Sequence, residues 1–336
     1  MKCTNNIKGF IKRTAAVIAV AAVCCTEVAG CGSAPLENVY NVEFGDNLGM
    51  PTNTYAKSAS MFSDDLCPPL KKDKGLRKVS YSMAEGSGLF NIDTKQTLYG
   101  DDINKKLYPA STTKILTAYI ALKELDLDKT VTVGQPACIQ PPGASLASLS
   151  PGDKLTVEDL LYGLLLVSGN DAADVLAAEI SGSAKKFKKR MNEELALLGA
   201  TNTHFCTSNG LHRDNHYTTV YDMHLIMRAA IQNEKFREII NTEQYTARFQ
   251  NASGSPKVIE YNTTNWFLSG KWSVPSGVEV VGGKTGTTTP AGYCLVIFAK
   301  NKKNERLISV VLGGHSREQL YALHSQMLKE FGNEAK

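Results

Sequence analysis

The chain has 336 residues, of which 43% are hydrophobic and 21% are charged, and its formal net charge is +4. The charge carries no concentrated basic stripe of the kind that binds nucleic acid, so we expect no nucleic-acid partner. The six histidines and eight cysteines show none of the close spacings that hold zinc, so we expect no metal and no cofactor.

The first 31 residues are predicted to be an export signal. Four cations between residues 2 and 13 precede an apolar run of 11 residues, Ala15–Cys25, which is too short to span a membrane. The segment Val28–Ser33 then resembles a bacterial lipobox, which would make Cys31 the lipidated N-terminus of the mature protein. Cleavage nearby by an ordinary signal peptidase is the alternative, and Glu27 beside the site is the residue that argues for it.

Residues 32–75 are predicted to form a flexible tether, because turn-forming residues are scattered through them and no helical or strand period persists. Residues 76–336 are predicted to be the globular domain, long enough for one core or for two lobes that share a cleft. Four cysteines lie beyond the signal, and the sequence leaves their pairing after export open: Cys67, Cys138, Cys206 and Cys294. Cys294 fits best as an unpaired core residue, because it lies in an apolar stretch.

The segment from Ala110 to Leu125 is predicted to be a buried helix, because it is apolar on nearly every side. Near its start lies an S-x-x-K pattern, Ser111 and Lys114. Residues three apart share one helix face, so the Lys114 amine is placed one turn from the Ser111 hydroxyl. A desolvated lysine can be neutral and can take the proton of a serine, which is otherwise a poor nucleophile. The backbone N–H of Ser111, near the positive end of the helix, can stabilise an oxyanion.

A second pattern, S-x-N, comprises Ser168, Gly169 and Asn170 and lies between helices predicted over 156–167 and 171–180. A tight loop at this point would fix polar side chains for a proton relay and for a contact to a substrate amide. Five cations follow between residues 185 and 190. They form the solvated face of a helix or, alternatively, a contact for anionic wall polymers.

The third pattern, K-T-G, comprises Lys284, Thr285 and Gly286 and ends a strand-like run that begins at Val278. Glycines around the motif leave the strand edge bare, so that a substrate backbone can pair with it. The Lys284 cation can hold a carboxylate and can lower the pKa of a nearby Lys114 by like-charge repulsion. An antiparallel hairpin is predicted beside this strand, over 291–299 and 306–312. A final helix over 317–331 is predicted to pack on the sheet.

These motifs, in this order, identify the chain from about 80 to 331 as similar to the serine-type D-Ala-D-Ala carboxypeptidases, the low-molecular-mass penicillin-binding proteins of the peptidase S11 family. The similarity extends beyond the short motifs, over Pro109–Thr117, Ser168–Ala172, Asn209–Leu211, His216–Met223, Lys284–Thr288 and Ala291–Tyr293. It implies an α+β fold of the β-lactamase/transpeptidase-like class. That fold has a five-stranded antiparallel sheet flanked by helices and an all-helical subdomain, here about 126–232, across the cleft.

The resemblance also implies roles for the residues of the first two motifs. Ser111 corresponds to the acylated nucleophile and Lys114 to its general base. Ser168 and Asn170 correspond to the groups that relay protons and orient the substrate amide.

The resemblance assigns substrate binding to residues of the third motif and beyond. Lys284, Thr285 and Gly286 correspond to the strand segment that positions the terminal carboxylate of the substrate. The backbone N–H of Thr287 corresponds to the second oxyanion donor. Arg317, just after the last predicted strand, corresponds to the carboxylate-binding arginine.

The function implied is an exported carboxypeptidase that removes the terminal D-Ala from peptidoglycan stem peptides through an acyl-enzyme on Ser111, and that β-lactams inhibit covalently. A β-lactamase of the same fold is the first alternative. It is disfavoured because the deacylating glutamate of an E-x-x-L-N motif is absent, and the segment 192–194 lies in a charged helical stretch instead. A low-turnover penicillin-binding sensor or scaffold is the second alternative, and the intact base and relay residues favour an enzyme.

Membrane attachment is expected at the N-terminus. Many members of the family carry a further β-rich domain and an amphipathic C-terminal membrane helix, whereas this chain stops soon after the helix predicted to end at Phe331. We therefore expect a lipid anchor on Cys31 to hold the protein at the outer face of the cell membrane.

Overall fold

The computed structural model describes residues 66–68 and 83–332. The predicted signal, Cys31 and most of the predicted tether lie outside the described residues. Among the residues that are described, no helix is long and apolar enough to cross a membrane.

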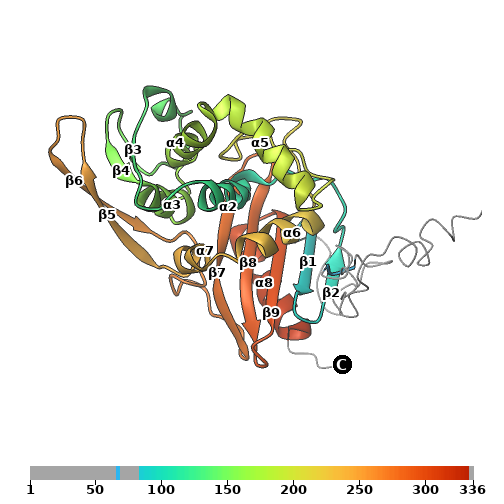
Figure 1. Cartoon of the computed structure of the whole chain (residues 1–336). Coiled ribbons are helices and arrows are strands. Elements are labelled where there is room, and N and C mark those ends of the chain that lie inside the picture. The colour runs from blue at the N-terminus through green and yellow to red at the C-terminus, as the bar shows by residue number, and fades with distance from the viewer. Residues whose placement is uncertain (1–65, 69–82, 333–336) are drawn as a thin grey trace, which may run out of the picture. The chain divides into compact units, whose positions relative to one another are not determined.

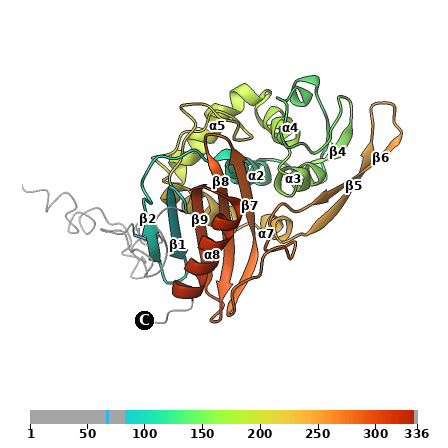
Figure 2. The ribbon, with the colours of Figure 1, turned by 180° about the vertical axis from the view of Figure 1, so that it is seen from behind.

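A five-stranded antiparallel sheet forms the first layer of the fold (Figure 1). Its strands, in spatial order, are β2 (Gln96–Asp101), β1 (Gly86–Asn91), β9 (Arg306–Gly314), β8 (Gly292–Asn301) and β7 (Val278–Thr288). Nearly every residue of β8 and β9 is buried, which requires that both faces of the sheet are covered. Figure 1 shows α6 (Val220–Ala230) in front of the sheet, and Figure 2 shows α8 (Arg317–Phe331) on the opposite face. The sheet, the hairpin of β8 and β9, and α8 are as predicted.

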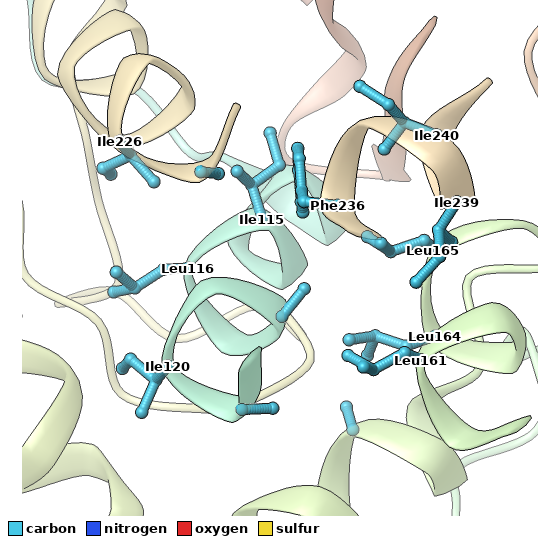
Figure 3. Packing of buried hydrophobic residues seen from close by; sticks show 14 of the residues in the cluster. Ile115, Leu116, Ile120, Leu161, Leu164, Leu165, Ile226, Phe236, Ile239 and Ile240 are labelled. Atoms are coloured by element: carbon cyan, nitrogen blue, oxygen red, sulfur yellow. The ribbon is translucent and has the colours of Figure 1, made fainter. Parts of the chain in front are cut away.

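The second layer is a group of helices at one end of the sheet. It comprises the 3-10 turns η5 (Ala110–Thr113) and η6 (Gln135–Cys138) and the helices α2 (Lys114–Glu124), α3 (Val157–Leu165), α4 (Asn170–Ser181), α5 (Ala184–Leu197) and α7 (Glu234–Ile240). The helix α2 is central because it is apolar all round. Figure 3 shows Ile115, Leu116 and Ile120 of α2 among side chains from α3, α6 and α7. The sequence pattern located α3 and α4 to within two residues at each end, and the helix predicted over 110–125 corresponds to η5 and α2. It did not predict η6 or α7, and it gave no bounds for α5.

The stretch predicted to be all-helical also contains two short strands, β3 (Thr130–Thr132) and β4 (Lys154–Thr156). They form a second, four-stranded antiparallel sheet with the long hairpin of β5 (Gln244–Gln250) and β6 (Pro256–Asn262). Three-residue strands are too short to give a period of two, so the sequence pattern missed them. Strand β4 runs directly into α3, where the Thr156 hydroxyl accepts a hydrogen bond from the backbone N–H of Asp159 and fixes the helix start.

Part of the predicted tether is packed against the domain, which corrects the boundary at residue 75. Cys67 is 1% exposed and belongs to the main core. The Tyr221 hydroxyl donates to the Cys67 carbonyl at 2.8 Å, and the Thr97 hydroxyl donates to the Pro68 carbonyl at 2.6 Å. Within the described residues, Cys67 and Pro68 of the predicted tether therefore contact the domain. Of the four cysteines left open above, all are free thiols in this structure, and Cys294 is buried as predicted.

Candidate active site

The nucleophile candidate Ser111 lies in the turn η5, which precedes α2 and was predicted as its first helical turn. Two threonine hydroxyls stabilise this turn, since Thr112 donates to the Pro109 carbonyl at 2.7 Å and Thr113 donates to the Ala110 carbonyl at 2.8 Å. Ala110 adopts a positive φ of 47°, which is rare for a residue with a side chain. The turn thus holds Ser111 at the junction of helix and sheet in a conformation that the surrounding residues impose.

Lys114, the first residue of α2, is completely buried beside Ser111. Its amine nitrogen lies 2.8 Å from Oγ of Ser111, 2.8 Å from Oδ1 of Asn170 and 2.7 Å from the carbonyl oxygen of Asn209. Burial, together with the positive charge of Lys284, holds the pKa of Lys114 well below its usual value. The structure therefore brings the S-x-x-K pair and the asparagine of S-x-N into one cluster, as predicted.

The S-x-N loop, between α3 and α4, has a strained backbone that hydrogen bonds hold in place. Ser168 has a positive φ of 62°, and its buried hydroxyl has no hydrogen-bond partner among the described residues. The backbone N–H of Asn170 donates to the Ser145 carbonyl at 2.8 Å. Asp171 fixes the facing loop by accepting the N–H of Ala147 at 2.8 Å. This support places the Ser168 hydroxyl at the wall of the cleft with its hydrogen-bonding capacity unused.

The K-T-G motif lies on β7, the edge strand of the sheet, as the sequence pattern indicated, and the strand continues past the motif to Thr288. Gly286 permits the closest approach between this strand and η5, because a Cβ at this position would lie 2.8 Å from the backbone nitrogen of Ser111. Lys284 is 1% exposed, and its amine donates to the Thr285 carbonyl at 2.8 Å. Burial lowers the pKa of Lys284 to about 7.

A cleft of about 290 Å³ opens over these residues. Its lining comprises Ser111, Ser145, Ser168, Thr263, Thr264, Trp266, Lys271, Thr285, Gly286, Thr287, Tyr293, Cys294, Arg317, Leu320 and Tyr321. The exposed Arg317, first residue of α8, lies over two aromatic rings of this lining, with its guanidinium carbon 5.3 Å from the Trp266 ring centre and 5.9 Å from that of Tyr293. The predicted site residues thus meet in one place, with Lys114, Asn170 and Lys284 buried beneath the cleft.

Sequence reasoning missed several supporting residues. The carbonyl of Asn209 contacts the Lys114 amine, and Gly210 beside it has a φ of 84° and packs so closely on η5 that a side chain would collide with the Ala110 carbonyl. The buried His216 lies with Nε2 2.9 Å from Oγ1 of Thr113. The patterns around Asn209 and His216 resemble the family, but no local spacing connects them to Ser111 about 100 residues earlier.

Comparison with known proteins agrees with this geometry. The sequence profile of the D-alanyl-D-alanine carboxypeptidase family, peptidase S11, matches residues 81–316. The D-alanyl-D-alanine carboxypeptidase DacF of Bacillus subtilis is 34% identical over 251 residues, which cover 73% of this chain and 61% of that protein. A D-alanyl-D-alanine carboxypeptidase of Streptomyces sp. is 35% identical over 244 residues, covering 69% of this chain and 81% of that protein. The chain therefore spans only about three fifths of the Bacillus protein.

Comparison with solved structures indicates the same family. The Streptomyces K15 DD-transpeptidase superimposes with a TM-score of 0.68 and 33% identity, covering 75% of this chain and 97% of that one. A D-alanyl-D-alanine carboxypeptidase from Mycobacterium tuberculosis superimposes with a TM-score of 0.65 and 31% identity, over 76% of this chain and 94% of that one. By profile, sequence and fold, the chain belongs to the peptidase S11 family of D-alanyl-D-alanine carboxypeptidases.

Proposed function

We propose that this protein is an exported serine D-alanyl-D-alanine carboxypeptidase that removes the terminal D-Ala of peptidoglycan stem peptides. The observation that carries the proposal is the position of the buried Lys114 amine, 2.8 Å from the Ser111 hydroxyl oxygen. Relatives named D-alanyl-D-alanine carboxypeptidase over the same region support it.

The contacts of Lys114 suit a neutral amine that acts as a base. A neutral amine has two N–H donors and one lone pair. The Asn170 amide oxygen and the Asn209 carbonyl can only accept, so they take the two N–H groups. The remaining lone pair then faces the Ser111 hydroxyl, which is the group that has a proton to give.

In the acylation step, Ser111 Oγ loses its proton to Lys114 and attacks the carbonyl carbon of the penultimate D-Ala. The backbone N–H groups of Ser111 and Thr287 are the proposed donors to the oxyanion. The close approach that Gly286 allows between β7 and η5 supports this pairing. The C–N bond then breaks, the departing amine takes a proton, and the acyl group stays on Ser111 as an ester that water hydrolyses.

The unpartnered hydroxyl of Ser168 supports a role in returning that proton. It lines the cleft, and Asn170, two residues later, contacts Lys114. A hydroxyl can accept one proton and donate another, so Ser168 can connect the Lys114 amine to the leaving nitrogen. The terminal carboxylate of the substrate is assigned to Lys284, Thr285 and Arg317.

β-Lactams are expected to acylate Ser111 in the same way, with little turnover. The stretch 192–194 is engaged in structural contacts instead of the cleft. Asn192 donates to the carbonyls of Lys188 and Phe205, and the buried Glu194 pairs with Lys123 and Arg190. This favours the carboxypeptidase over a β-lactamase.

The proposal is tested by two assays on the purified protein. Release of D-Ala from a diacyl-Lys-D-Ala-D-Ala peptide is measured beside hydrolysis of benzylpenicillin. We expect D-Ala release, slow penicillin turnover, and loss of both D-Ala release and covalent penicillin labelling in Ser111→Ala. A protein that hydrolyses penicillin faster than the peptide would be a β-lactamase, and one that is labelled without releasing D-Ala would be a sensor or scaffold.

We further propose that Cys31 carries a lipid anchor on the outer face of the membrane. A lipidated N-terminal cysteine carries a diacylglycerol, and two acyl chains hold a protein stably on a bilayer where one does not. In Cys31→Ala cells, we expect the protein to remain unprocessed or to be released into the soluble fraction. Processed Cys31→Ala protein that stays in the membrane fraction would contradict this assignment.

A further inference from the structure

The lining of the cleft includes a cation besides the residues that the proposed function uses. Two exposed cations line it, Lys271 and Arg317. The described residues that line this cleft include no aspartate or glutamate. The positive charge of the cleft therefore includes one cation, Lys271, that the proposed function does not use.

Lys271 lies in a segment, from Trp266 to Trp272, that hydrogen bonds hold in place. The backbone N–H of Trp272 donates to the Trp266 carbonyl at 3.0 Å, and the Trp272 indole N–H donates to the Ser325 hydroxyl of α8 at 3.0 Å. The Trp266 N–H in turn donates to the Tyr321 hydroxyl of α8 at 2.8 Å. The segment that contains Lys271 is thus attached to α8, the helix that begins with Arg317, through the backbone of Trp266 and the side chain of Trp272.

The segment also lies beside the part of β7 that is assigned to the substrate carboxylate. The hydroxyl of Thr264 lies 2.7 Å from that of Thr285. Because the terminal carboxylate belongs to the leaving residue, this end of the cleft is the leaving-group side. Lys271 therefore faces the residue that is released and not the acyl part that stays on Ser111.

The two cations differ in how they are held. Arg317 lies over the rings of Trp266 and Tyr293, so its charge is positioned for one anion. Lys271 makes no hydrogen bond or ion pair with the described residues, although it sits in the same cleft. A free ammonium at the wall of a substrate cleft that has no acidic lining residue is a binding group for a second anion.

Resting on the proposed function, we infer that Lys271 forms a subsite for an acidic side chain on the leaving residue. The enzyme then prefers substrates in which the residue after D-Ala is a D-amino acid with a second carboxylate over substrates in which that residue is its neutral isostere. The reaction is the same hydrolysis: water is consumed, the amide bond breaks, and the free acidic D-amino acid leaves with a protonated amine. The added contact is a partly screened ion pair, so we expect about a three- to fivefold gain in kcat/KM.

The test compares two diacyl-Lys-D-Ala-X peptides, in which X is D-Glu or D-Gln, with the D-Ala-D-Ala peptide as reference. The measured quantity is the ratio of kcat/KM for D-Glu to that for D-Gln, which cancels differences in active-enzyme fraction. We expect a ratio of about three to five in the unmodified protein, a ratio near one in Lys271→Met, and a ratio below one in Lys271→Glu. Lys186→Met, an exposed lysine on α5 outside the cleft lining, should keep the original ratio.

Salt gives a second readout. The ratio should fall toward one as ionic strength rises from about 0.02 to 0.5 M, because an exposed ion pair is screened over that range. A ratio of one in the unmodified protein, or a ratio that persists in both Lys271 variants, would overturn the subsite while leaving the carboxypeptidase intact. Failure to release any D-Ala from the reference peptide would instead overturn the proposed function, and the subsite with it.

Discussion

Two lysines are buried in one site, and their different surroundings suggest opposite protonation states. Lys114 contacts two acceptors and one hydroxyl, whereas Lys284 donates to a backbone carbonyl at the strand edge. Burial lowers the pKa of both. The charge of Lys284 lowers the pKa of Lys114 further, so we expect Lys114 to accept a proton and Lys284 to hold an anion.

Replacing Lys114 with arginine tests the base directly. Arginine keeps its proton at any ordinary pH and cannot take one from Ser111. We expect Lys114→Arg to slow acylation by a fluorescent penicillin by a factor of about 10² to 10⁴, the usual contribution of a general base. Lys123→Arg, on the same helix but half-exposed, should acylate at the original rate. Normal acylation in a folded Lys114→Arg protein would move the base to another residue.

The pH dependence of kcat/KM tests Lys284. With its pKa at about 7, Lys284 is charged below pH 7 and loses its charge as the pH rises through that value. We expect kcat/KM for a peptide with a free terminal carboxylate to fall above pH 7, by up to about tenfold per pH unit. The matched peptide with a terminal amide has no carboxylate for Lys284 to bind and should not show this fall. Equal profiles for the two peptides would contradict the assignment.

At the scale of elements, the site depends on the contact between the edge strand β7 and the turn η5. Gly286→Ala would place a methyl carbon 2.8 Å from the Ser111 nitrogen and 2.9 Å from that of Thr112. Because both neighbours are backbone, the strand has to move, and a displacement of about 1 Å can cost 10²-fold in rate. We expect the rate of penicillin acylation to fall by about that factor. Circular dichroism should show that the fold is retained.

A glycine with no close neighbour, Gly134, provides the control for this prediction. A Cβ at Gly134 would meet only Cδ of Pro136 at 3.6 Å, which is ordinary contact, so Gly134→Ala should acylate normally. If Gly286→Ala acylates as fast as Gly134→Ala, then the close approach of β7 to η5 is not what positions the site.

Several of the longer elements were predicted from their patterns. Helix α8 was predicted with its observed bounds, Arg317–Phe331, because fifteen residues give a clear apolar face. The turn η5 was predicted as part of the helix that follows it, whereas β3 and β4 were missed, since three residues carry no period. The longer strands β5 and β6 were not predicted either. The K-T-G triplet was predicted at the end of its strand, whereas β7 continues to Thr288, because the glycines that make β7 accessible also weaken its strand signal.

At the scale of the whole molecule, the sequence could not show which distant segments converge. The Lys114 amine contacts the carbonyl of Asn209, and only the tertiary fold brings the two together. Cys67 enters the main core through contacts with β1 and α6, although the segment around it has no periodic pattern. Contacts made by backbone carbonyls and by single buried residues leave no local signal in a sequence.

The same core contains buried histidines that couple folding to pH. Burial lowers the pKa of His216, His224 and His324 to about 3, whereas a histidine in the unfolded chain has a pKa of about 6.5. Their contribution to stability is therefore present above pH 6.5 and is lost as the pH falls toward 3. Each lost contribution amounts to about 1.4 kcal/mol per pH unit. Asp174 and Asp222, whose pKa values are raised by burial, oppose this loss.

We therefore expect the free energy of unfolding to fall steeply below pH 6.5 and the domain to unfold between about pH 3.5 and 5, because the total stability of a domain is only about 5 to 15 kcal/mol. Urea unfolding at pH 7, 6 and 5, followed by circular dichroism, measures the slope. His324→Gln loses the contact to Ser309, so it should be less stable at pH 7, yet its stability should depend less on pH. His315→Gln, at an exposed position, should leave the slope unchanged. Equal slopes in the His324→Gln and His315→Gln proteins would mean that burial of His324 does not link folding to protonation.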